Sequence, residues 1–331
     1  IDPVFPLSRK NHRIVYIEGE SNQRLSKRYT IMEKILNSRN EKASDVLKNL
    51  AFAGMMEKYG ENSFIRGLHL WELRCIQKFD FVGHYLLAYQ IFKRYADSAG
   101  IEVWARGAVP SSLLCYSLGL TKIEPLDYGL HHSRFVNDET PKFQFDVESK
   151  RFDEFMEGAE RILAANADDF DTDVIRGSLL HDVVRMDYLT KKHPRPVPDD
   201  IDDELARYAL KFPDTMDLYD CYLRRKNGEP WQKTGFAPLD RILAPTCGIL
   251  AYQEQMFDII RALLSNHGLR TNKIRKIIQR GDNEEIAACK ALLFQPGAFV
   301  INMADAEIAW QVLTSNRRAF LKAHAVSRVA A

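Results

Sequence analysis

The chain has 331 residues, a length that suits one large domain or two modest ones. Hydrophobic residues make up 46% of it and charged residues 27%, which is typical of a soluble globular protein. No apolar run approaches the length of a membrane span and no signal peptide opens the chain, so we expect a cytoplasmic protein without membrane contact.

The net charge of +1 indicates no partner by itself, but its distribution is uneven. Residues 261–331 contain eleven Lys and Arg against five Asp and Glu, a balance of +6, which leaves about −5 for the rest. Such a basic stretch is typical of nucleic-acid-binding surfaces, and equally of a solvated helical face. The candidate DNA contacts within it are Arg275, Lys276 and Arg280.

The five cysteines are scattered without a C-x-x-C pair, which favours buried, reduced thiols in a cytosolic protein. Residues 1–3 read IDP without a methionine, and we expect the chain to be either trimmed at its start or a fragment of a longer protein.

Helical periodicity dominates the first hundred residues and predicts helices at 43–59, 63–77 and 81–98. A short strand is predicted at 101–104, and a new helix starts at Pro110 and ends at Gly119.

Residues 142–148 alternate, with Phe143, Phe145 and Val147 on one face of a predicted strand. We expect the other, exposed face to present Gln144, Asp146 and Glu148 close to Gly107. The proline-rich residues 191–198 are predicted to be a linker. The further predicted helices are at 150–166, 175–190, 200–211, 214–226, 250–265, 269–280, 283–294 and 304–328.

Two features of the sequence suggest a chemical role: a glycine turn at 103–112 and, after it, a pair of acids on the strand at 142–148. Residues 103–112 predict a strand, a glycine turn and a helix, whose free N–H groups suit a phosphate, with Arg106, Gly107, Ser111 and Ser112 as candidate contacts. The alternative is a plain strand-to-helix connection.

Asp146 and Glu148 form a D-x-E pair on one face of the predicted strand. Phosphoryl transfer by two metal ions needs carboxylates close together, so both are candidate catalytic residues and metal ligands. The alternative is an exposed strand that carries acids on its wet face.

Together with strings elsewhere in the chain, these features resemble the polymerase core of the bacterial DNA polymerase III alpha subunit, a C-family polymerase. The strings are WELRCIQKFDFVGHYL at 71–86, RGAVPSSLLCYSLG at 106–119, EPLDYGL at 124–130, SRFVN at 133–137, PKFQFDVES at 141–149, YDCYLRRKNG at 219–228, GILAYQEQM at 248–256 and FLKAHA at 320–325.

The resemblance implies an α+β, predominantly helical fold. It consists of a DNA polymerase beta-like nucleotidyltransferase palm with a small mixed sheet, followed by a reduced all-helical fingers region. The corresponding domains are a helical extension at 1–60, a palm-like domain at 61–190 and a fingers-like region at 199–331. The resemblance also implies that Arg134, Lys322 and His324 contact the phosphates of a nucleotide.

The departures from the family pattern fall on its chemistry. Gln144 stands where the family has a metal-binding Asp, and an amide cannot supply the negative charge that holds a hard cation. Ala108 replaces a serine of the phosphate turn. The segment with the family's third carboxylate is not found. Asp173 and Asp182 are the nearest candidates for it, and we expect both to cap or decorate helices.

Three hypotheses follow. The first is a DNA polymerase III alpha-like protein of DNA replication or repair that binds DNA, primed or single-stranded, and nucleotide, with polymerisation lost or weak because of a degenerate active site. The second is an active, minimal DNA polymerase or nucleotidyltransferase that uses Mg²⁺ on Asp146 and Glu148. The third is a non-catalytic module that binds protein, such as a replication or repair protein.

Overall fold

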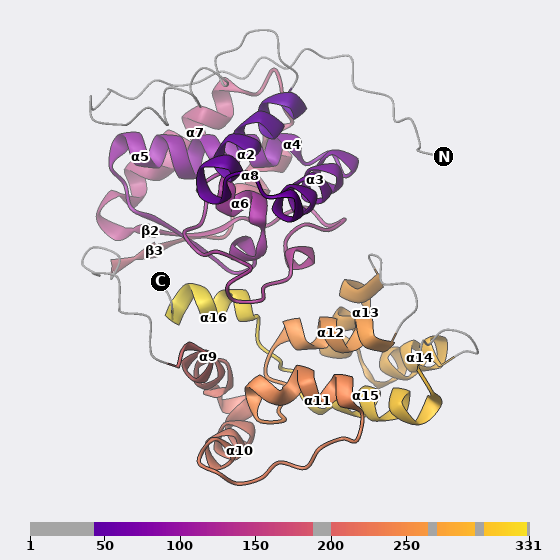
Figure 1. The fold of residues 1–331 in the computed structure, drawn as a ribbon. Helices are drawn as coiled ribbons and strands as arrows, with labels where there is room; N and C mark the ends of the chain where they lie inside the picture. The colour runs from indigo at the N-terminus through magenta and orange to yellow at the C-terminus, as the bar shows by residue number, and fades with distance from the viewer. Residues whose placement is uncertain (1–42, 188–199, 264–269, 295–300, 330–331) are drawn as a thin grey trace, which may run out of the picture. The chain divides into compact units, whose positions relative to one another are not determined.

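Figure 1 shows the computed structural model, which describes residues 43–187, 200–263, 270–294 and 301–329. The chain divides into two compact units. Residues 127–134 belong to the second unit, although the chain on either side of them belongs to the first. The predicted linker at 191–198, and the part of the predicted extension before residue 43, lie outside the described residues.

The first unit combines helices with one short sheet. Its helical segments are α2 (Ala43–Tyr59), α3 (Ser63–Lys78), α4 (Val82–Ala88), the π-helical η1 (Tyr89–Tyr95), α5 (Ala96–Ala99), η2 (Val109–Ser111), α6 (Leu113–Ser117), η4 (Ser149–Arg151), α7 (Phe152–Ala165) and α8 (Thr172–Leu179). Helix α2 confirms the helix predicted at 43–59. The apolar stripe whose spacing predicted this helix is buried: Val46, Leu47, Leu50, Ala51 and Met55. The helix predicted at 81–98 is one run of α4, η1 and α5.

The sheet of the first unit has the strand order β1-β2-β3. Strand β1 (Val103–Arg106) pairs antiparallel with β2 (Gln144–Glu148), and β2 pairs parallel with β3 (Val183–Met186). The sheet is therefore small and mixed, as predicted. In the register of the antiparallel pair, Arg106 lies opposite Gln144 and Trp104 opposite Asp146.

One face of β2 forms the core of this unit. The side chains of Phe143, Phe145 and Val147 are at most 1% exposed, and the ring of Phe92 stacks on that of Phe145 with centroids 3.9 Å apart. This confirms the face assignment made from the alternation. The opposite face is not simply exposed, because Asp146 is buried.

Strand β3 corrects the prediction of a helix at 175–190. Helix α8 ends at Leu179, and the chain then turns into β3 beside β2. Val183 and Val184 are β-branched, which favours a strand only weakly in so short a segment. Their pairing with Phe145 and Asp146 of β2 determines the strand conformation.

In the described residues of the second unit, the regular secondary structure is helical apart from one isolated β-bridge. Its segments are η3 (His132–Arg134), α9 (Ile201–Leu210), η6 (Pro213–Thr215), α10 (Met216–Lys226), α11 (Ala237–Leu243), η7 (Ala244–Thr246), α12 (Gln253–Leu263), α13 (Arg270–Arg280), α14 (Asn283–Leu293), α15 (Met303–Ser315) and α16 (Lys322–Val329). The sequence did not predict α11. One core joins apolar side chains of α11, α12, α13 and α15.

The single helix predicted at 304–328 is wrong, since the chain breaks between α15 and α16. Asn316 donates from its side chain to the carbonyl of Leu250 at 2.8 Å. Phe320 then pairs with Tyr252 in an isolated parallel bridge. These contacts hold residues 316–321 in extended and turn conformations, which an uninterrupted helix could not adopt.

Residues 127–134 are fixed to the second unit by polar contacts. His131 Nε2 lies 3.2 Å from Asp258 Oδ1, and Arg261 lies within hydrogen-bonding distance of His131 and Ser133. Burial, together with the charges of Arg261 and His131, lowers the pKa of His132 to about 4.

Within the described part of the chain, none of the helices is both long and apolar enough to cross a membrane.

Candidate functional site

The centre of the candidate site in the first unit is an ion pair. Arg106, the last residue of β1, donates from Nε to Asp146 Oδ1 at 2.9 Å and from Nη2 to the carbonyl of Asp182 at 2.7 Å. The side chain of Asp146 is 1% exposed and that of Arg106 14% exposed. The carboxylate predicted to hold a metal ion thus faces a cation that the protein itself supplies.

Gln144 fills the space beside the glycine turn. Gly107 has a φ of 63°, in the left-handed region, and a Cβ added to it would lie 1.7 Å from Gln144 Oε1. The amide nitrogen of Gln144 lies 3.4 Å from Asp182 Oδ2. Gln144 therefore lies close to Gly107, as predicted, and its amide occupies the space next to the turn.

Asp182, a candidate for the third carboxylate that was expected to cap or decorate a helix, lies beside Gln144. It directly precedes β3 instead of decorating a helix, and its carboxylate contacts Gln144 and His181. The β-branched pair after it was the available signal for a strand. Asp173, the other candidate, is an exposed residue of α8 that pairs with Arg176.

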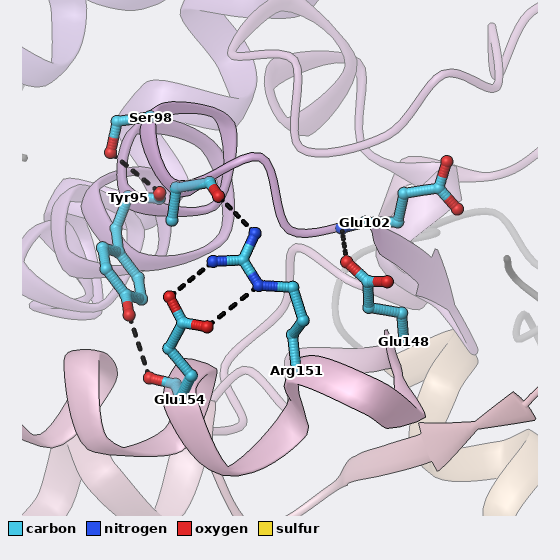
Figure 2. A network of polar contacts seen from close by, with 7 residues as sticks. Tyr95, Ser98, Glu102, Glu148, Arg151 and Glu154 are labelled. Carbon is cyan, nitrogen blue, oxygen red and sulfur yellow. Dashed lines mark hydrogen bonds and ion pairs between the residues drawn. The ribbon is translucent and has the colours of Figure 1, made fainter. Parts of the chain in front are cut away.

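Glu148 ends β2 in a different set of contacts, which Figure 2 shows from close by. Its Oε1 accepts the backbone amide of Glu102 at 3.0 Å. Beside it, Arg151 forms a two-point ion pair with Glu154 and donates to the carbonyl of Ala99. The contact shown for Glu148 is structural, since it ties the chain ahead of β1 to the end of β2.

The side chains of Gln144, Asp146 and Glu148 do not provide the ligands that Mg²⁺ prefers. A hard dication prefers several oxygen ligands, mainly carboxylates. Here one oxygen of Asp146 bonds Arg106, Glu148 bonds a backbone amide, and Gln144 is neutral. Among the described residues, no group of three or more His, Cys, Asp or Glu is arranged to hold a metal ion. Mg²⁺ binding at Asp146 and Glu148 stays a prediction.

The helix after the glycine turn is capped from within the unit. The buried carboxylate of Glu72 accepts the amides of Leu113 and Leu114, each at 3.0 Å, and the hydroxyl of Ser112 at 2.7 Å. Burial raises the pKa of Glu72 to about 7, although all three of these hydrogen bonds act to lower it.

Both candidate serines of the turn are buried. Ser112 also accepts the amide of Cys115, and the hydroxyl of Ser111 donates to the carbonyl of Ala108. The N–H groups of Leu113 and Leu114 start the helix whose free amides were expected to suit a phosphate, and they bind Glu72 instead. This corrects the expectation of free amides at this helix end.

The candidates Arg134, Lys322 and His324 lie in the second unit. Lys322 donates from Nζ to the carbonyl of Tyr128 at 2.8 Å. Arg134 lies over the ring of Phe257 and 3.4 Å from the side-chain oxygen of Asn272. Residues far apart in sequence thus join the segment 127–134 to α12, α13 and the start of α16.

The start of α16 repeats the capping seen at α6. Buried Glu254 accepts the amides of Lys322 and Ala323 at 2.8 and 3.2 Å. His324 lies on the first turn of this helix, and its ring is 5.7 Å from that of Phe320. In both units a carboxylate of the chain itself holds the helix end near the candidate phosphate contacts.

The candidate DNA contacts of α13 differ in exposure. Arg275 is 3% exposed and bonds the side chains of Asn272 and Gln279. This corrects its assignment as a surface contact, since its guanidinium serves the packing of α13. Arg280 is exposed and Lys276 half-buried, while Lys273, which the sequence analysis left out, is exposed.

Comparison with known proteins gives two family matches. Residues 45–165 match the bacterial DNA polymerase III alpha NTPase domain. Residues 188–298 match the finger domain of the bacterial DNA polymerase III alpha subunit. The first match contains β1, the glycine turn and β2, and the second contains α9 to α14.

Curated relatives are similar over part of the chain. An error-prone DNA polymerase of Cutibacterium acnes is 31% identical over 114 residues, which are 34% of this chain and 10% of that protein. The DNA polymerase III subunit alpha of Halalkalibacterium halodurans is 30% identical over 141 residues, 41% of this chain and 12% of that protein. The chain therefore matches about a tenth of the length of these relatives.

Proposed function

We propose that this chain, which belongs to the bacterial DNA polymerase III alpha family, binds nucleic acid or nucleotide and has lost most or all polymerisation. In this proposal the first unit is a palm of the DNA polymerase beta-like type and the second a reduced fingers region. DNA and nucleotide are its ligands, and replication or repair is its setting.

The ion pair of Arg106 with Asp146 is the main observation that supports the proposed loss of polymerisation. Two-metal phosphoryl transfer needs carboxylates that are free to bridge cations. A metal ion held by both oxygens of Asp146 would displace Arg106 from Oδ1 and leave a largely buried guanidinium without that partner, which is costly. Gln144 adds no negative charge to offset this cost.

Exposed cations of α13 support binding. Lys273 and Arg280 lie on this helix in the basic C-terminal stretch, where they are available to phosphates. Contacts of this kind bind nucleic acid with little regard to sequence and weaken as salt rises.

An active Mg²⁺-dependent nucleotidyltransferase is the second candidate, and the position of Asp182 favours it. Its carboxylate lies 3.4 Å from the amide nitrogen of Gln144, so an acid next to the start of β3 lies close to β2. Activity would still require Arg106 to release Asp146.

One experiment separates these functions. Fluorescence anisotropy would follow a labelled primed template at two salt concentrations, and primer extension with Mg²⁺ and all four deoxynucleotides would use the same DNA. We expect salt-sensitive binding without extension. Extension that Asp146→Asn abolishes would establish the enzyme. Absence of binding at low salt would contradict the proposal and favour a module that binds protein.

Two double variants, each of which replaces two cations with two acids, serve as test and control. Lys273→Glu with Arg280→Glu reverses two exposed cations of α13, and Lys48→Glu with Lys150→Glu makes the same change of net charge at exposed sites of the first unit. The proposal requires the first pair to weaken binding more than the second.

A further inference from the structure

Three aromatic rings of the second unit pack together, two of them stacked and the third edge-on. The rings of Phe212 and Phe320 are nearly parallel, with an interplanar angle of 12° and centroids 5.2 Å apart. Tyr208 meets both rings at its edge, with centroids 6.2 and 5.8 Å away. The three residues come from the end of α9, the residue after Lys211 and the segment between α15 and α16.

Backbone contacts fix the two stacked rings. The amide of Phe320 donates to the carbonyl of Ala251, and its carbonyl accepts the amide of Gln253, both at 2.8 Å. The carbonyl of Phe212 accepts the amide of Thr215 at 2.9 Å, in the turn that begins with Pro213. The backbone that carries these rings is therefore ordered without a ligand, which lowers the entropy cost of binding one.

The stack reaches the surface. Phe212 is 37% exposed, and Met216 on the next turn is 43% exposed. Large apolar side chains gain most when fully buried, so an aromatic ring stacked on one neighbour and still in contact with water retains area for a ligand.

One cation lies over a ring, and two others are near it in the sequence or through Asp214. Lys211 lies 4.0 Å above the centroid of Tyr208, and the side chain of Arg318 is 72% exposed. Lys322 follows Phe320 by two residues. Arg318 lies 3.5 Å from Asp214, which a phosphate would have to displace.

We propose that Tyr208, Phe212 and Phe320 form a stacking platform for a base of single-stranded nucleic acid, with Lys211 and Arg318 beside its phosphates. Aromatic rings interleaved with cations are the combination that binds single strands, since every base has a π face. Bases inside a duplex are stacked on both faces and cannot use such a ring. This inference rests on the proposed function and adds the strandedness of the ligand.

The test uses the full chain, a fluorescein-labelled twelve-residue oligothymidylate and a duplex of equal length. We expect Phe212→Ala to weaken single-strand binding by about 5- to 150-fold, the usual effect of removing one base stack. Phe212→Leu, which keeps apolar bulk without the ring, is expected to behave in the same way. Phe212→Trp keeps a ring, so it should retain affinity and show quenched tryptophan emission when the oligonucleotide binds. Met216→Ala is the matched control for exposed apolar area.

The outcomes separate the platform from the proposed function. Wild-type affinity of Phe212→Ala and Phe212→Leu for the single strand, or equal losses for single strand and duplex, would overturn the platform and leave nucleic-acid binding intact. If the wild-type chain binds neither DNA at low salt, both proposals fail. A concentration-dependent dimer in sedimentation that Phe212→Leu abolishes would assign the rings to a second copy of the chain and overturn the platform.

Discussion

Arg106 Nε lies 2.9 Å from Asp146 Oδ1, and this contact joins two neighbouring strands of the small sheet. The acid is buried and the arginine nearly so. The protein's own cation thus neutralises the strand carboxylate on which polymerisation would depend. Removal of one partner from such a pair costs much more than the intact pair contributes.

We expect Arg106→Met to lower the free energy of unfolding by about 3 kcal/mol, because it leaves the carboxylate of Asp146 buried without its cation. Urea denaturation followed by circular dichroism would measure the change. Arg176→Met is the matched control, since Arg176 pairs with Glu160 through side chains that are 47% and 44% exposed. Such surface pairs contribute at most about 1 kcal/mol. Equal losses in the two variants would show that the Arg106 contact is dispensable.

Glu72 predicts a pH dependence of stability. Burial raises its pKa in the folded chain from 4.5 to about 7, so the folded state holds the proton more tightly than the unfolded state. The contribution is fully present below pH 4.5 and is lost as the pH rises to about 7. The free energy of unfolding of the wild type, relative to Glu72→Gln, should fall over that window by up to about 3 kcal/mol.

Chemical denaturation at several pH values would measure this difference. Glu157→Gln removes a carboxylate from an exposed position of α7 and controls for net charge. A difference that rises with pH would mean that Glu72 is ionised in the folded chain, where its three hydrogen bonds would then dominate over burial.

The sequence predicted those elements whose local pattern agrees with their packing. The apolar stripe of α2 and the alternation of Phe143, Phe145 and Val147 were both confirmed, since burial of one face sets each pattern. The four-residue strand β3 was missed because its conformation comes from pairing with β2, which is distant in the chain. The break at Asn316 was missed for a related reason, since its partner Leu250 lies 66 residues away.

The candidate site could be predicted in outline only. The sequence placed Gln144 next to Gly107 correctly from the strand and turn. It could not show that Arg106 would turn onto Asp146, or that Glu72 would take the amides of α6, because both are contacts between side chains and distant elements. For α13 the pattern identified a basic helix, but the exposure of Lys273 and the burial of Arg275 depend on what packs around it.

Gly107 tests the fit of the glycine turn against Gln144. Gly107→Ala should destabilise the chain by about 2 kcal/mol, because the left-handed backbone costs about 1–2 kcal/mol for a residue with a Cβ and the new methyl group meets Gln144 Oε1. Adding Gln144→Ala should restore part of the loss. Thermal unfolding of both variants would measure this, with Gly177→Ala on α8 as the control, since no atom lies within 4 Å of its added Cβ. No partial rescue would mean that only backbone strain acts there.

Helix α13 should separate binding from stability. Lys273→Glu with Arg280→Glu should weaken binding to DNA of any sequence without lowering the melting temperature. The salt slope should fall by about one for each phosphate that these side chains neutralise in the wild type. Arg275→Met should lower the melting temperature instead, since Arg275 is buried and bonds Asn272 and Gln279. Anisotropy and thermal melting on the same samples would decide. If Arg275→Met lost DNA binding at an unchanged melting temperature, Arg275 would be a DNA contact and not a packing residue.

The last prediction separates a lost enzyme from a working one. Gln144→Asp places a second strand carboxylate two residues before Asp146, and each added anionic ligand favours Mg²⁺. Calorimetry with Mg²⁺ alone should therefore show tighter binding to this variant than to the wild type. Primer extension should stay at background, even with Ala108→Ser added, because Arg106 still pairs with Asp146 and the amides of Leu113 and Leu114 still bind Glu72. Gln144→Asn is the matched variant without added charge. Template-directed extension by the unmodified chain, lost in Asp146→Asn or Glu148→Gln, would show that Arg106 releases Asp146 when substrate binds.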